Sequence, residues 1–134
     1  MNRVILFLLS IVLINSCNKE KPIGKWDDII KLSTKNVEFE AKADSVLITT
    51  EGDWWWVDAI KLNDSIYQYY NNEDINLESE SYTIIEDDFI VERQDKKTLF
   101  IKLDENLTGR ERMMLIGLQA GNYYDSVKIK QKAQ

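Results

Sequence analysis

Residues 123–131 read Tyr-Tyr-Asp-Ser-Val-Lys-Ile-Lys-Gln, and apolar and polar side chains alternate along the second half of this run. Val127 and Ile129 fall on one face, and charged lysines fall on the other. Alternation with period two is typical of a β-strand that has one face in a core. A second such run covers residues 112–119, and the loop Ala120-Gly121-Asn122 between the two is of the kind that closes a hairpin. The end of the chain therefore predicts an antiparallel pair of strands.

The same alternation recurs upstream between clusters of turn residues. It covers residues 37–41, 46–50, 54–57 and 99–103. No long stretch shows helical periodicity. About seven to nine short strands at close spacing predict an all-β protein, built as an antiparallel β-sandwich.

Length and composition exclude several classes of function. The chain has 134 residues, which leaves room for one domain. Its net charge of −6 provides no basic stripe for a nucleic-acid backbone. It contains no histidine and one cysteine, which removes Ser-His-Asp and Cys-His pairs and the common zinc ligand sets. We expect no catalytic residues, no metal and no cofactor.

The N-terminal segment has the pattern of an export signal. Arg3 precedes an apolar run, residues 4–14, that is too short to span a membrane. The run ends in Leu13-Ile14-Asn15-Ser16-Cys17, which resembles the lipobox of bacterial lipoproteins. This resemblance implies a signal peptide over residues 1–16 and lipidation of Cys17, which would anchor the protein to a membrane. An ordinary signal peptide with an incidental cysteine is the alternative.

The remaining chain divides into a tether and a domain. Residues 17–28 contain the only proline and are mostly polar, so we expect a lipidated N-terminus followed by a short linker. Residues 29–134 are expected to form the sandwich. No second cysteine is present to form a disulfide, so the sandwich depends on its hydrophobic core.

Four markers in this domain follow one another in the order of a known family. They are Leu32-Ser33 with Val37-Glu38-Phe39, then Glu51-Gly52-Asp53-Trp54, then Asn106-Leu107-Thr108-Gly109-Arg110, and finally Val127-Lys128-Ile129-Lys130-Gln131. Together they resemble a BACON domain, a bacterial immunoglobulin-like module often found in envelope and carbohydrate-active proteins. The resemblance implies an immunoglobulin-like sandwich.

The chain departs from the family at two places. Phe89 stands where the family commonly carries a second tryptophan, and we expect it to substitute in the core. Residues 58–87 are longer than the family's usual connection, so they are expected to add a hairpin or edge strands. A function beyond the scaffold would lie in such an elaboration.

The tryptophan run is the first candidate for a ligand site. Alternation places Trp54 and Trp56 on one face and Trp55 on the other. Trp54 matches the family's tryptophan position, which implies that Trp54 and Trp56 lie in the core and that Trp55 points outward. The alternative is that the added segment folds over Trp55 and buries it.

The added segment supplies the other candidates. Tyr67 and Tyr69 share a face, and Tyr70 lies on the other face beside Asn71 and Asn72. Trp55, Tyr67 and Tyr69 would form an aromatic platform for the apolar faces of sugar rings, with amides nearby to bind hydroxyl groups. Packing of the tyrosines in cross-strand pairs is the alternative. Tyr123 and Tyr124 beside Asn122 form a second aromatic tip.

Acidic pairs are weaker candidates. Asp87-Asp88 and Glu73-Asp74 have the composition of a glycosidase carboxylate pair or of calcium ligands. Hydrolysis needs a cleft that encloses a sugar, and calcium loops show an alternating spacing that is absent from this sequence. Solvated charge at loop tips explains these residues.

Two functions follow as expectations. The first is a non-catalytic lipoprotein of the cell envelope, anchored in the outer membrane, that binds glycan or glycoprotein through exposed aromatic side chains. The second is a protein–protein interaction module or an accessory or spacer subunit of an envelope complex. The partners are then a glycan or an envelope protein, with the membrane reached through the lipid and no nucleic acid involved. The sequence leaves open whether the domain faces the periplasm or the outside.

Overall fold

The structure is a computed structural model that describes residues 26–134, and it is all-β over this range. The expected signal peptide, Cys17 and the tether up to residue 25 lie outside the described residues. Within the described part of the chain, no helix has the length and apolar character needed to cross a membrane.

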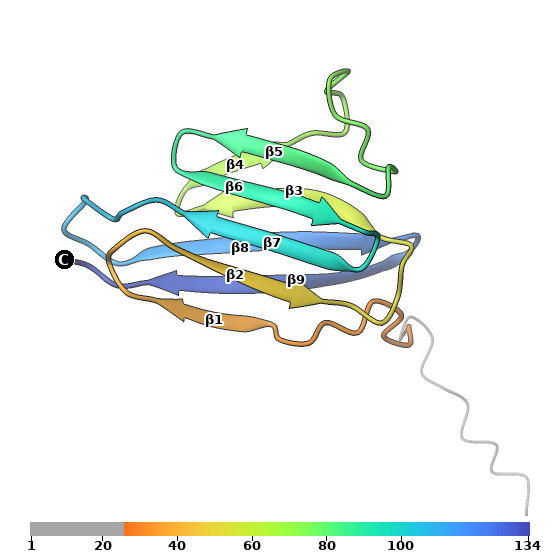
Figure 1. Ribbon diagram of the computed structural model, residues 1–134, viewed down its shortest axis with the longest axis horizontal. Coiled ribbons are helices and arrows are strands. Elements are labelled where there is room, and N and C mark those ends of the chain that lie inside the picture. Colours follow the sequence, from red (N-terminus) through yellow and green to blue (C-terminus); the bar gives the residue numbers. More distant parts are fainter. Residues whose placement is uncertain (1–25) are drawn as a thin grey trace, which may run out of the picture.

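Nine strands form two sheets packed face to face (Figure 1). One sheet has five strands in the order β1-β9-β8-β3-β4, and the other has four in the order β2-β7-β6-β5. Neighbouring strands are antiparallel except β1 and β9, which run parallel. The strands are β1 (Asn36–Phe39), β2 (Asp44–Thr49), β3 (Trp56–Leu62), β4 (Ser65–Gln68), β5 (Tyr82–Glu86), β6 (Phe89–Gln94), β7 (Thr98–Leu103), β8 (Arg112–Ala120) and β9 (Tyr123–Gln131). The predicted antiparallel sandwich of seven to nine strands is confirmed.

The closing hairpin forms as its sequence pattern predicts. β8 and β9 pair along their whole lengths, from Arg112 opposite Gln131 to Ala120 opposite Tyr123. Val127 and Ile129 are fully buried, and Phe89 is also in the core. Residues 58–87 hold most of β3 together with β4 and β5, and the last two are edge strands of the two sheets.

The core lies between the inner faces of the two sheets. Alternate residues of β6, β7, β8 and β9 point into it, which is why these strands show buried positions at every second residue. Buried polar side chains occur near the ends of the sandwich, and among the described residues every buried side-chain nitrogen and oxygen has a hydrogen-bond partner.

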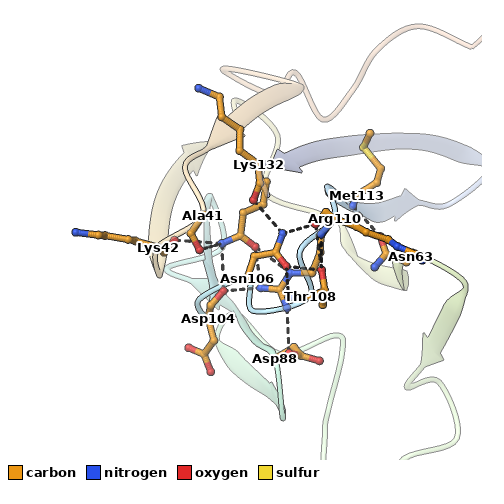
Figure 2. Close-up of polar contacts among 12 residues, drawn as sticks. Ala41, Lys42, Asn63, Asp88, Asp104, Asn106, Thr108, Arg110, Met113 and Lys132 are labelled. Atoms are coloured by element: carbon orange, nitrogen blue, oxygen red, sulfur yellow. Dashed lines mark hydrogen bonds and ion pairs between the residues drawn. The ribbon is translucent and has the colours of Figure 1, made fainter. Parts of the chain in front are cut away.

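One of these polar clusters closes the end of the sandwich where β8 begins (Figure 2). The Arg112 guanidinium donates to Oε1 of Gln131 at 2.7 Å and to the Asp88 carboxylate at 3.0 Å. Gln131 in turn donates to the carbonyl oxygen of Lys42 at 3.1 Å. The cluster joins strands of both sheets and gives the buried cation hydrogen-bonded partners.

The residues just before Ile30 make defined contacts with the folded domain. Asp28 was assigned to the tether, yet its Oδ1 accepts the backbone N–H groups of Ile30 at 3.1 Å and Lys31 at 2.7 Å. Next to it, a Cβ atom on Gly52 would lie 2.2 Å from the carbonyl oxygen of Ile29. Only glycine permits this approach, so the segment before residue 30 is part of the folded domain.

The expected orientation of the tryptophan run is also wrong. Trp55 is 1% exposed and lies in the core, whereas Trp54 is 64% exposed and Trp56 is half-buried. A β-bulge at Asp58 is the physical reason, because Val57 pairs with Leu118 while Ala59 pairs with the next residue, Gly117. The bulge reverses the alternation, so the odd-numbered positions are inward before it and the even-numbered positions are inward after it.

Candidate functional site

The exposed aromatic side chains gather at one end of the sandwich. Among the described residues, the large aromatic side chains that are exposed are Trp26, Trp54, Tyr70 and Tyr124. All four lie at the end where β3 begins and where β8 turns into β9, on the right in Figure 1. We call this set, together with Trp56, Asn122 and Tyr123, the aromatic end.

Trp54 is placed by the turn between β8 and β9. Gly121 in this turn has a φ of +60°, and a Cβ atom there would lie 3.2 Å from the Trp54 indole. The turn therefore favours glycine for its backbone conformation and for the close approach of the ring. On its other side, the Trp54 ring meets Trp56 edge to face, with centroids 5.7 Å apart and an interplanar angle of 78°.

A hollow of about 340 Å³ lies on one side of the tryptophan pair. It is lined by Trp26, Trp54 and Tyr123, and by the polar residues Asp27 and Asn122. Flat aromatic walls next to an amide and a carboxylate are the arrangement that sugar rings require, because the rings stack through C–H groups and bind through hydroxyl groups.

A second hollow of about 310 Å³ lies on the other side of the pair. Trp56, Tyr69 and Tyr70 line it, together with Asn76 and Glu78 from the loop before β5. Because one member of the tryptophan pair lines each hollow, the two hollows form neighbouring parts of one surface.

Ion pairs and a hydrogen bond surround Tyr123, which lines the first hollow. Lys35 contacts Asp125 at 2.7 Å and Asp28 at 3.4 Å, and the Tyr123 hydroxyl donates to Asp125 at 3.3 Å. Burial and the two carboxylates raise the pKa of Tyr123 well above its usual value. Burial acts to raise the pKa of Asp28, but hydrogen bonds from Lys31 and Tyr123 and the charge of Lys35 lower it overall. Asp28 and Asp125 therefore hold Tyr123 as the neutral phenol, which fixes its ring as a wall of the hollow.

A buried cation supports the aromatic end from within. The Arg93 guanidinium lies 4.6 Å above the Trp55 ring and donates to the carbonyl oxygens of Asp53 at 2.6 Å and Ser79 at 2.7 Å. The Trp55 indole N–H donates to the Thr50 hydroxyl at 3.0 Å. Burial lowers the pKa of Arg93 from its usual value. These contacts fix the backbone just before Trp54 and leave no polar group of Trp55 for a ligand.

The aromatic platform expected from the sequence does not form. Trp55 is in the core, and Tyr69 is buried with its hydroxyl donating to Glu86 at 2.9 Å. Tyr67 is half-buried and packs edge to face on Phe89, with centroids 5.2 Å apart. Tyr67 and Tyr69 do share a face, but it is the face that covers the core. Phe89 belongs to the opposite sheet, so Tyr67 packs across the core and not in a pair of aromatic side chains on neighbouring strands.

The other candidates of the added segment lie at the surface. Tyr70 is exposed and lines the second hollow, as stated above, and Asn71 and Asn72 are exposed in the loop that follows. The Asn72 side-chain oxygen accepts the backbone N–H of Asp74 at 2.8 Å, which shapes that loop. Neither asparagine lines a hollow described here.

Trp26 and Trp54 are exposed at the aromatic end, where the sequence pattern did not predict them. Trp26 lies within the segment assigned to the tether, and the signal that could have found it is a tryptophan in an otherwise polar stretch. The tip formed by Tyr123, Tyr124 and Asn122 was noted as a second candidate, and it is part of the aromatic end.

The acidic pairs lie in exposed turns and loops. Asp88 is engaged by Arg112, and Glu73 and Asp74 are exposed in a loop. In residues 26–134 no group of three or more metal-ligating side chains is placed to hold an ion.

Comparisons with known proteins bear on the fold. No protein-family model and no curated protein matches the chain. A protein from Bacteroides thetaiotaomicron solved by NMR has a similar structure, with a TM-score of 0.62, 20% sequence identity, and coverage of 85% of this chain and 94% of that one. A xyloglucanase from Bacteroides ovatus, solved with a heptasaccharide, is similar over 78% of this chain but 19% of its own, with 18% identity and a TM-score of 0.49. The likeness to the Bacteroides thetaiotaomicron protein is one of fold.

Proposed function

We propose that this protein binds glycan, free or carried by a glycoprotein, through the aromatic end. The observation that carries the proposal is that all four exposed aromatic side chains of the described region lie at one end of the sandwich, and that three of them, Trp26, Trp54 and Tyr70, line two hollows that also contain amide and carboxylate groups. Large exposed aromatic side chains keep apolar surface in contact with water unless a ligand covers them. Sugar rings are suited to cover them, because their apolar faces stack on aromatic rings.

The geometry favours a short chain of sugars over a single unit. The two hollows meet at the Trp54–Trp56 pair, whose rings are almost perpendicular, so each ring offers a stacking surface to a different unit. Asp27 lines the first hollow and Glu78 the second. The exposed Glu78 carboxylate would repel acidic sugars in the second hollow, so the expected ligand is a neutral oligosaccharide.

The proposal includes the setting expected from the sequence. The chain would be an envelope lipoprotein of the BACON type, anchored in the outer membrane through Cys17 and acting without catalysis. The lipobox-like sequence supports the anchor, and the four ordered markers support the family assignment.

A screen of the purified protein against a glycan array tests the function, and titration calorimetry of each hit measures the affinity. We expect Trp54→Ala and Trp26→Ala to weaken binding at least about tenfold, which corresponds to about 1.4 kcal/mol. Leu107→Ala is the matched control, because Leu107 is 74% exposed in the loop before β8, at the opposite end.

Two outcomes would overturn the proposal. One is unchanged affinity in both tryptophan variants, which would move the site elsewhere. The other is the absence of binding to any neutral glycan, which would favour the alternative of an envelope protein as the partner.

A further inference from the structure

The cations at the surface of this acidic protein divide into a paired group and an unpaired group. Carboxylates lie within 4 Å of Lys31, Lys35, Lys96, Lys102, Lys130 and Lys132. Within residues 26–134, the exposed cations that lack such a carboxylate are Lys42, Lys61, Lys97, Arg110 and Lys128. In a chain with a net charge of −6, a place where several unpaired cations gather has a local charge opposite to that of the whole protein.

Three of these unpaired cations line one hollow. Lys61, Arg110 and Lys128 surround a space of about 590 Å³, which is larger than either hollow of the aromatic end. Lys61 and Lys128 flank Leu115 in one row across β3, β8 and β9, on the outer face of the five-stranded sheet. Arg110 comes from the loop before β8, so the hollow lies at the end opposite the aromatic end (Figure 1). We call it the basic hollow.

The carboxylates in the basic hollow do not balance these charges. Glu111 lines it but already contacts Lys130 at 2.9 Å. Asp64 is the remaining carboxylate of the lining. The lining therefore holds three cations and only one carboxylate that is not already paired with a lysine. The local charge is positive.

Asn63 adds a neutral donor to the basic hollow. Its side-chain oxygen accepts the backbone N–H of Met113 at 2.9 Å, and its own backbone N–H donates to the Met113 carbonyl at 2.8 Å. Because the N–H of Met113 requires the oxygen of the amide, the orientation of the Asn63 side chain is fixed. Its NH₂ group has no hydrogen-bond partner within the described chain, so it can donate to a ligand.

Hydrogen bonds hold the backbone of the loop that carries Arg110 (Figure 2). Asn106 is fully buried and donates to the carbonyl oxygens of Arg110 at 2.7 Å and Lys132 at 2.9 Å. Its side-chain oxygen accepts the backbone N–H of Thr108 at 3.1 Å, and the Thr108 hydroxyl donates within the same loop. A site whose walls are held in place before binding loses less conformational entropy when the ligand arrives.

We propose that the basic hollow binds an anionic oxygen group, a carboxylate, sulfate or phosphate, of a small ligand. Lys61, Lys128 and Arg110 supply the charge, and Asn63 supplies a fixed neutral donor. Arginine and lysine around an oxyanion form charge-assisted hydrogen bonds, which are stronger than neutral ones. This site does not rest on glycan binding at the aromatic end, because it shares no residue with it.

The test is a titration of the full-length protein with sodium phosphate, sodium sulfate and sodium glucuronate, followed by amide chemical shifts and calorimetry. We expect at least one of these anions to bind with a Kd of about 1 mM or tighter and to shift the side-chain amide of Asn63. Stronger binding of glucuronate assigns the group to an acidic sugar, and stronger binding of phosphate or sulfate assigns it to a tetrahedral oxyanion. Either ranking supports the site.

A matched pair of double variants separates a site from general electrostatics. Lys61→Gln with Lys128→Gln removes two charges from the basic hollow, and Lys42→Gln with Lys97→Gln removes two exposed, unpaired charges elsewhere. We expect at least a tenfold loss of affinity in the first variant and less than about a twofold loss in the second. Asn63→Asp keeps the oxygen that accepts the Met113 N–H but replaces the NH₂ donor with a carboxylate, so it should also abolish binding.

Two results would overturn the proposal. One is equal weakening in the two double variants, which would show attraction to overall charge and not to a site. The other is the absence of binding by all three anions to a chain whose circular dichroism spectrum shows the folded sandwich. Neither result depends on whether the aromatic end binds glycan.

Discussion

Truncation of Trp55 should destabilise the protein far more than truncation of Trp54. Trp55 is 1% exposed, donates a hydrogen bond to Thr50 and lies 4.6 Å below the Arg93 guanidinium. Removal of a buried tryptophan side chain costs about 3–5 kcal/mol, and loss of the cation–π contact adds about 0.5–2 kcal/mol. We therefore expect Trp55→Ala to lower the free energy of unfolding by about 4 kcal/mol or more. For a domain of this size, that corresponds to a fall in Tm of roughly 15 °C.

Trp54→Ala supplies the contrast. The Trp54 ring is mostly exposed, and its removal costs mainly the edge-to-face contact with Trp56. We therefore expect Trp54→Ala to lower the free energy of unfolding by less than about 1 kcal/mol. Trp55→Phe should fall between the two, because it keeps a ring under Arg93 but loses the hydrogen bond to Thr50. Urea unfolding followed by circular dichroism measures all three variants. A loss in Trp54→Ala equal to that in Trp55→Ala would refute the assignment of inner and outer tryptophans.

Two further predictions concern packing and pH. Gly52→Ala should lower the free energy of unfolding by about 1–3 kcal/mol, because the added Cβ would lie 2.2 Å from the Ile29 carbonyl oxygen; an unchanged urea midpoint would contradict this. Burial raises the pKa of Tyr82 to about 12, and burial with nearby carboxylates raises the pKa of Tyr69 and Tyr123 further. Above about pH 10 the unfolded chain therefore releases protons that the folded chain retains, so stability should be constant near neutral pH and fall as the pH rises past 10. Urea titrations across this range measure the effect, and stability that does not decrease would show that these phenols are accessible.

Local alternation was sufficient to predict the sandwich. Residues 112–119 and 123–131 carry strict period-two patterns around a glycine turn, and the structure pairs them as predicted. Phe89 was expected to substitute in the core, and it lies there. These features depend on neighbours in the sequence or on a clear contrast between apolar and charged side chains.

The orientation of the tryptophan run could not be predicted in this way. Three consecutive tryptophans give no contrast between an inner and an outer face. Trp55 is selected for the core by Arg93 and Thr50, and Arg93 is remote in sequence. The bulge at Asp58 also reverses the alternation, and a single inserted residue leaves no mark in composition.

The aromatic end could not be predicted as a unit for a related reason. Trp26, Trp54 and Tyr123 belong to three segments that only the completed fold brings together. The basic hollow is similar, since Lys61 and Lys128 are brought into one row by pairing through β8. Sites assembled from distant strands require the topology, which a local pattern does not contain.

The position of Trp26 at the aromatic end sets the reach of the proposed glycan site. Trp26 lies nine positions after Cys17, and a chain of that length spans at most roughly 30 Å when fully extended. With Cys17 lipidated as proposed, the aromatic end stays within that distance of the bilayer, while the basic hollow lies at the far end of the sandwich. Glycans that extend down to the membrane surface, or that are attached to neighbouring anchored proteins, would then meet the aromatic end first. A small anionic ligand that arrives from beyond the surface would come first to the lysines and arginine of the opposite end.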